Sequence, residues 1–120
     1  MFVHRYVPKD AQGKNAKLDG YIDLICPTHS QRFKYFEMSG FNVDKDGNMD
    51  TETMGMVNAA SKLLPIVKEH VKELKLTIID DNTTINSVDE LEVFPELQNV
   101  QLEIAMMILQ GFRPSPKPKP

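Results

Sequence analysis

The sequence predicts an α+β fold, with an N-terminal antiparallel β-hairpin packed against a mainly helical remainder of three to four helices. Residues 17–26 alternate apolar and polar side chains, as does a strand with one buried face. Residues 52–74 and 95–111 instead carry apolar side chains three and four positions apart, the spacing of one helix face. The whole chain has 120 residues, the length of a single α+β domain, which we expect to span residues 1–112.

The hairpin is predicted from two stretches near the N-terminus. Residues 1–7 alternate loosely and stop at Pro8, as an edge strand does. We expect them to pair antiparallel with residues 17–26 across residues 8–15, which are polar and contain a glycine. This connection is longer than the roughly two to five residues that are usual for a hairpin.

A short helix is predicted to follow the hairpin. Thr28 and Gln31 have the spacing of a capping box, in which each side chain bonds the other residue's backbone N–H. The helix should end near Met38, before a Ser-Gly pair. Phe33 and Phe36 lie three positions apart, and we expect both to pack on the sheet.

The next helix is predicted from about residue 52 to residue 74. Pro65 falls inside it, and proline removes a backbone N–H and crowds the preceding turn. We therefore expect the helix either to kink or to divide in two at Leu64. Residues 74–79 then become rich in β-forming side chains, and after an Asp-Asp-Asn turn residues 83–85 can return, which predicts a possible second short hairpin.

The last helix is predicted over residues 95–111. Ser87 and Glu90 cap a short turn before it, Pro95 suits its first turn, and Gly111 can close it. Apolar side chains cover most of its circumference, so its second apolar face must be covered by this chain or by another molecule. The sequence leaves both possibilities open. We expect a protein interface made by Leu102, Ile104, Met106, Met107, Ile108 and Leu109.

The composition is that of an ordinary soluble protein. Hydrophobic residues make up 41%, charged residues 26%, and the net charge is −3, which predicts no nucleic-acid partner and no membrane partner. The N-terminus lacks the basic-then-apolar order of a signal peptide, so we expect a cytoplasmic protein. Residues 113–120 are rich in proline and lysine and are expected to be a disordered tail.

Residues 44–48, Asp-Lys-Asp-Gly-Asn, match the opening of an EF-hand calcium loop. The match fails where glycine should make the sharp turn, at Met49, and where a glutamate should close the site, at Gly55. We expect a plain turn between Asp44 and Asn48, and a metal-binding domain using this loop is the alternative.

The sequence shows no catalytic motif. Cys26 and His29 have the spacing of half a zinc site, but no second cysteine exists, and His4 and His70 are isolated. The same pair lacks the orienting third group that a cysteine nucleophile needs. No phosphate-binding or nucleophile-elbow motif is present. We therefore predict that the protein is not an enzyme and has no catalytic residues, resident metal or cofactor.

The order of these elements resembles that of a known family. Residues 20–24, Gly-Tyr-Ile-Asp-Leu, lead into Pro27 and Thr28, and residues 87–111 begin with Ser-Val-Asp-Glu-Leu and end in the apolar helix. Over residues 17–112 this layout is similar to that of the tail assembly chaperones of long-tailed bacteriophages. The resemblance implies a small protein of the host bacterial cytoplasm that coats the tape measure protein and recruits tail tube subunits, without catalysis.

Two expectations follow from the resemblance and from the apolar last helix together. The protein should self-associate as a homo-oligomer, and it should bind an apolar client through residues 102–109. The alternative is a small dimeric protein-interaction adaptor of a bacterium or phage, which would use the same helix to dimerise. The sequence does not separate these two binding roles.

Overall fold

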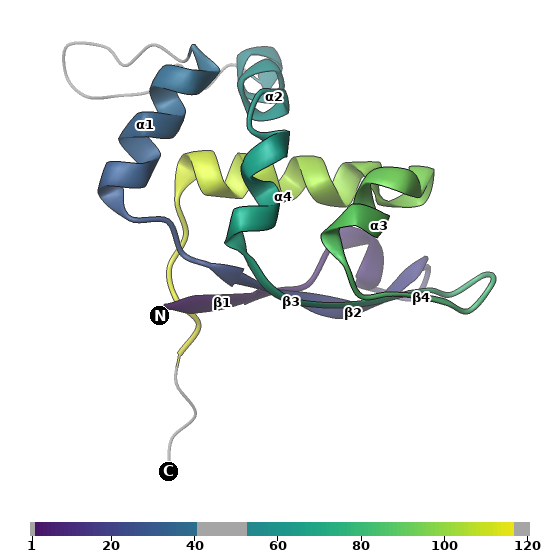
Figure 1. Ribbon diagram of the computed structural model, residues 1–120. Helices are drawn as coiled ribbons and strands as arrows, with labels where there is room; N and C mark the ends of the chain where they lie inside the picture. Colours follow the sequence, from purple (N-terminus) through teal and green to yellow (C-terminus); the bar gives the residue numbers. More distant parts are fainter. Residues whose placement is uncertain (1, 41–52, 117–120) are drawn as a thin grey trace.

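The computed structural model describes residues 2–40 and 53–116, and the helices lie over one face of a four-stranded antiparallel sheet of order β1-β2-β3-β4 (Figure 1). This confirms the predicted α+β class. The strands are β1 (Val3–Tyr6), β2 (Leu18–Ile25), β3 (Val71–Ile78) and β4 (Thr83–Ile85). The α-helices are α1 (His29–Ser39), α2 (Thr53–Ser61), α3 (Val88–Val93) and α4 (Gln98–Gln110), and the 3-10 helices are η1 (Lys9–Ala11), η2 (Leu64–His70) and η3 (Pro95–Leu97).

Both predicted hairpins are present. In the first, β1 pairs with β2 so that Val3 lies opposite Ile25 and Tyr6 opposite Ile22. In the second, β3 pairs with β4, and the turn between them contains Asn82 at a positive φ of 55°. The second hairpin is therefore real, and β3 also joins it to the first hairpin by pairing with β2.

The predicted division of the second helix at Leu64 is confirmed, but its predicted extension to residue 74 is wrong, because residues 71–74 belong to a strand. Helix α2 ends at Ser61, and the short 3-10 helix η2 begins at Leu64 with Pro65 in its first turn. A proline tolerates a first turn but not a helix interior, so the chain restarts there. Val71 and Leu74 then belong to strand β3, where Leu74 points into the core.

Helix α1 begins as predicted but packs differently. The Thr28 hydroxyl accepts a hydrogen bond from the Gln31 N–H at 3.1 Å, and the Gln31 side chain accepts one from the Thr28 N–H at 2.9 Å. Tyr35, however, is the buried aromatic, while Phe33 is 67% exposed, so the expected placement of Phe33 on the sheet is wrong. The reason is that α1 packs against α4 and α2 rather than on the strands.

A buried hydrogen-bonded chain ties α1 to the sheet. His70 is 2% exposed, its Nδ1 lies 2.9 Å from the Ile25 carbonyl oxygen, and its Nε2 lies 2.7 Å from the Tyr35 hydroxyl. Because a carbonyl only accepts, Nδ1 carries the proton and Nε2 accepts from the tyrosine. All polar atoms of the imidazole are therefore satisfied, and His70 is a structural residue.

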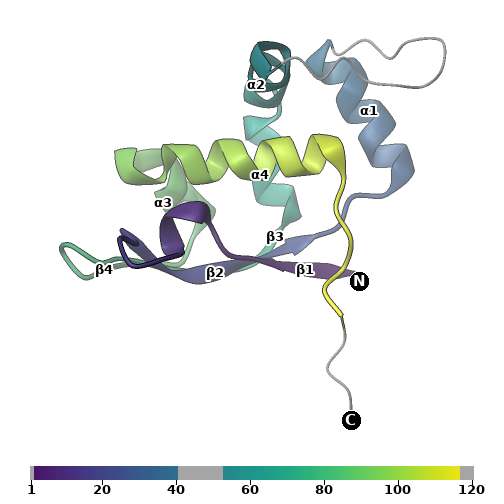
Figure 2. The ribbon, with the colours of Figure 1, turned by 180° about the vertical axis from the view of Figure 1, so that it is seen from behind.

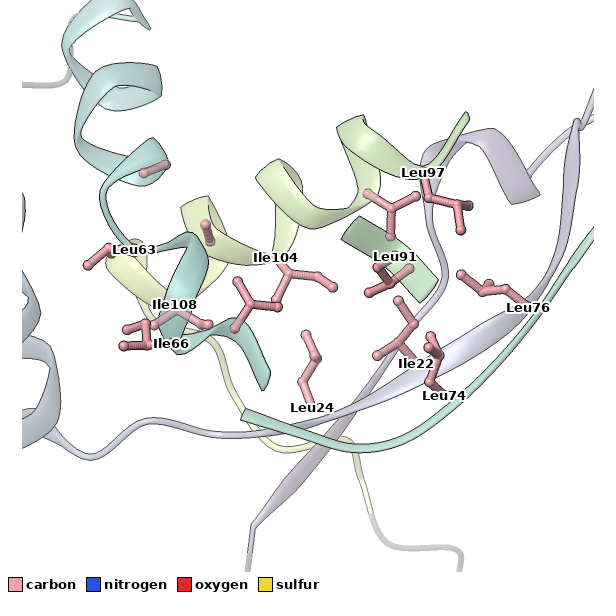
Figure 3. Packing of buried hydrophobic residues seen from close by; sticks show 14 of the residues in the cluster. Ile22, Leu24, Leu63, Ile66, Leu74, Leu76, Leu91, Leu97, Ile104 and Ile108 are labelled. Carbon is pink, nitrogen blue, oxygen red and sulfur yellow. The ribbon is translucent and has the colours of Figure 1, made fainter. Parts of the chain in front are cut away.

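Helix α4 forms the centre of the molecule. Figure 3 shows Ile104 among buried side chains of the sheet and of the neighbouring helices, including Ile22 and Leu24. At its C-terminal end, the Arg32 guanidinium from α1 donates to the carbonyl oxygens of Leu109 and Gln110 at 3.2 and 2.6 Å. A cation at this position satisfies helix-end carbonyls and complements the helix dipole, so α1 fixes the end of α4.

Candidate functional site: a groove between strand β1 and helix α4

The expected interface on α4 divides into two sets. Ile104, Ile108 and Leu109 are fully buried within this chain, so the prediction that they face a partner is wrong. The second apolar face that the sequence revealed is covered by α1, α2, α3 and η2. Leu102, Met106 and Met107 are only partly buried, and their proposed contact with a partner stays a prediction.

The two methionines line an open groove of about 540 Å³. The groove lies between α4 on one side and β1 with the following segment on the other, and Figure 2 shows this side of the molecule. This volume lies within the range of specific ligand pockets. Its lining residues are His4, Arg5, Tyr6, Val7, Lys9, Gln12, Glu103, Met106, Met107 and Gln110. Leu102 lies outside this lining.

The alternation of β1 decides which side chains reach α4. Tyr6 points toward the helix, where its hydroxyl donates to the Glu103 carboxylate, and the His4 ring lies 5.5 Å from the Phe112 ring. Arg5, between them, points to the opposite face of the sheet. There it makes two hydrogen bonds to the Asp23 carboxylate, at 2.9 and 3.1 Å, and lies 3.9 Å over the Tyr21 ring.

The groove therefore has an apolar wall and one acidic group. Burial raises the pKa of the Glu103 carboxyl, and the Lys9 backbone N–H opposes this in part. A raised carboxyl pKa marks a place where water solvates an ion poorly. Lys9 also lines the groove, so its wall combines apolar side chains with one acidic and one basic group.

Replacing Glu103 with glutamine should raise the free energy of unfolding at pH 7 but not near pH 3.5. A carboxyl whose folded pKa is raised destabilises the fold when ionised, and this cost disappears as the pH falls below its unfolded pKa, at about 4.3. Glutamine keeps an oxygen that can accept from the Tyr6 hydroxyl. Urea unfolding of both proteins at the two pH values measures the difference.

The control is Asp23→Asn, for which the opposite sign is expected. The hydrogen bonds from Arg5 lower the pKa of the Asp23 carboxyl, so its ionised form stabilises the fold above the unfolded pKa. The Asp23→Asn variant should be less stable than the parent at pH 7, and this difference should shrink as the pH falls. If both substitutions changed the free energy of unfolding at pH 7 in the same direction, the opposite environments assigned to Glu103 and Asp23 would be contradicted.

The outer edge of β1, which borders the groove at Arg5 and Val7, already holds a piece of the chain. The Ser115 N–H donates to the Val3 carbonyl oxygen at 3.0 Å, and the Arg5 N–H donates to the Ser115 hydroxyl at 2.8 Å. Ser115 belongs to the segment that was expected to be a disordered tail, and the structure places it against β1, while residues 117–120 lie outside the described part of the chain. No sequence pattern indicated this contact, since it joins residues 110 positions apart.

The metal and cysteine sites considered from the sequence can be compared with the described residues. Within residues 2–40 and 53–116, no three His, Cys, Asp or Glu side chains are placed to hold a metal ion. The Asp44 to Asn48 loop lies outside the described residues, so its expected turn is not tested. Cys26 is half-buried and free, and burial raises the pKa of its thiol, which disfavours the thiolate that a nucleophile requires.

Comparisons with known proteins give no relative. No protein-family model matches the chain, and no curated protein and no solved structure is significantly similar to it. None of the helices in the described segments has the length and apolar character that crossing a membrane requires. The fold and the groove define a class: a small α+β protein with an open groove beside a sheet edge.

Proposed function

We propose that the protein is a non-enzymatic tail assembly chaperone of a long-tailed bacteriophage, which acts in the host bacterial cytoplasm. Its client would be an apolar segment of the tape measure protein, and its other partners would be tail tube subunits. The observation that supports a binding role is the groove, where Met106 and Met107 are left partly exposed on a helix that the chain otherwise covers.

The chemistry of the groove suits a chaperone. Methionine side chains are flexible and polarisable, so they adapt to clients of varied shape. A single groove of this size would bind weakly, which favours release at the end of assembly. Several self-associated copies along one long client would hold it through their summed contacts. Weak individual binding and homo-oligomerisation are therefore parts of one proposal.

Solution mass by light scattering tests this function. The full chain, alone and with a co-expressed fragment of a tape measure protein, should form an oligomer and then a larger soluble complex. The double variant Met106→Glu, Met107→Glu should lose the complex, because a bound apolar client would remove water from two carboxylates without supplying a partner charge. Val93→Glu, at a residue that is 75% exposed on α3 and outside the groove, is the matched control and should keep it.

The same light-scattering measurement distinguishes the chaperone from the alternative role, a small dimeric adaptor. An adaptor would form a complex of fixed two-to-two mass with one folded partner and would leave the tape measure fragment insoluble. A strictly monomeric protein that leaves the fragment insoluble would contradict both roles.

A further inference from the structure

We propose that the outer edge of β1 is a strand-addition site, where an extended, uncharged segment of the client pairs with β1 as a fifth strand under Met106 and Met107. This rests on the proposed function for the identity of the client, but its geometry depends only on the strand edge and the groove. Strand addition is a recurring mode of peptide recognition, in which backbone hydrogen bonds give affinity and side-chain pockets give selectivity.

The backbone groups of β1 alternate between its partner strand and the groove. The two hydrogen bonds from Ser115 show that the Val3 carbonyl and the Arg5 N–H point away from β2. In an antiparallel ladder, the N–H and C=O of one residue point the same way, and residues two apart share that direction. The Arg5 carbonyl and the Val7 N–H therefore also point outward.

These two groups are available to a new strand. The Val7 carbonyl already accepts from the Gln12 side chain at 2.9 Å. For the Arg5 carbonyl and the Val7 N–H, the part of the chain that the structure describes offers no partner. Both residues line the groove. An open strand edge of this kind is a template for an extended chain, which supplies a donor and an acceptor at alternate residues.

Helix α4 covers the space that an added strand would enter. A fifth strand would lie about 4.8 Å beyond β1. Its side chains on the α4 side would then contact Met106 and Met107, which line the same groove as the strand edge. Among the residues that line the groove, Glu103 already accepts from the Tyr6 hydroxyl, and Lys9 contributes a single opposite charge, so the lining has no excess charge for a charged occupant to pair with. The occupant that fits is an extended segment with alternating apolar side chains and no net charge.

The chain's own tail is a competing but weak occupant. Ser115 is the contact between the tail and the β1 backbone, and Phe112 adds a ring contact with His4. Within the described residues, Ser115 is the only tail residue that hydrogen-bonds to the β1 backbone, so the tail holds the strand edge through a single residue. A client segment that supplies a continuous ladder would therefore displace it.

The test uses a synthetic probe of about six alternating valine and threonine residues, labelled with fluorescein, and the full-length chain. Fluorescence polarisation should show binding, and Ser115→Pro, which removes both tail hydrogen bonds, should tighten it by about tenfold. A twin probe with N-methyl groups on alternate residues loses the donors on one edge and should bind at least about tenfold more weakly. Thermal unfolding of Ser115→Pro checks that the fold is kept.

Amide hydrogen exchange identifies the site of the added strand. The Val7 amide should exchange rapidly in the free protein and become protected at saturating probe, while the exposed Val93 segment should not change. The proposal is overturned if both probes bind equally well, if Ser115→Pro binds neither probe, or if Val7 exchange is unaffected at saturation.

The same measurements distinguish this inference from the proposed function. Probe binding with Val7 protection, together with a tape measure fragment that stays insoluble, would leave strand addition standing and remove the chaperone role. A soluble complex with the fragment in which Val7 exchange is unaffected would leave the chaperone role standing and remove strand addition.

Discussion

Replacing Gly20 with alanine should destabilise the protein by about 4 kcal/mol or more, close to the whole stability of a small domain. Gly20 lies in β2 with φ at +128°, a conformation that residues with a side chain rarely adopt. A Cβ added there would lie 2.0 Å from the Lys75 carbonyl oxygen on β3. Neither strand can move away, because β2 and β3 form the central ladder of the sheet. Thermal and urea unfolding measure the loss.

Gly55→Ala is the matched control. Gly55 lies in α2, where an added Cβ meets no atom within 4 Å. Alanine there should stabilise the protein by about 0.5–1 kcal/mol, because glycine loses more backbone entropy in a helix. If the Gly20→Ala and Gly55→Ala variants had equal free energies of unfolding, the close approach of the β3 backbone to Gly20 would be contradicted.

The second large effect is expected at Leu109. This side chain is fully buried, so Leu109→Asp places an unpaired charge in the core and should unfold the protein, whereas Leu109→Ala should cost about 2–5 kcal/mol. Met106→Glu, three positions earlier but in the open groove, should change stability by about 1 kcal/mol or less. Circular dichroism and urea unfolding of the three variants separate core from groove along one helix.

A folded Leu109→Asp variant that had lost client binding would reverse this assignment. Leu109 would then be an interface residue, as its place in the apolar pattern of the last helix suggested, and α4 would be less enclosed by α1 and α2 than the structure shows. If Met106→Glu were unfolded, the placement of Met106 in an open groove would be contradicted in the same way.

Local signals in the sequence were sufficient for much of the fold. Alternation predicted the first hairpin, β-forming side chains around an Asp-Asp-Asn turn predicted the second, and the Thr28 capping box predicted the start of α1. The end of the second helix was missed because Val71 and Leu74 also fit helical spacing. What makes them a strand is pairing with β2, more than forty residues earlier in the chain, and no local pattern reports that.

The groove could be predicted only in part, because it too depends on contacts between segments that are far apart in the sequence. Helical spacing showed that α4 is apolar on more than one face, but it could not show what covers each face. Ile104, Ile108 and Leu109 are buried in the core that α4 forms with the sheet and the neighbouring helices, while Met106 and Met107 line the groove beside β1. The contact of Ser115 with β1 depends on where α4 ends in space, which the Arg32 guanidinium helps to fix.

The hydrogen bond between Val3 and Ser115 brings the first and last described segments of the chain to one place (Figure 1). The two described ends of the chain, Phe2 and Pro116, are each one residue from this hydrogen bond, and an affinity tag or reporter joined directly to either of them would lie close to the groove. The β3–β4 turn lies at the opposite border of the sheet. A fluorophore attached at Asp81 in that turn would leave the groove clear, and a circularly permuted chain could be opened there and joined through a short linker.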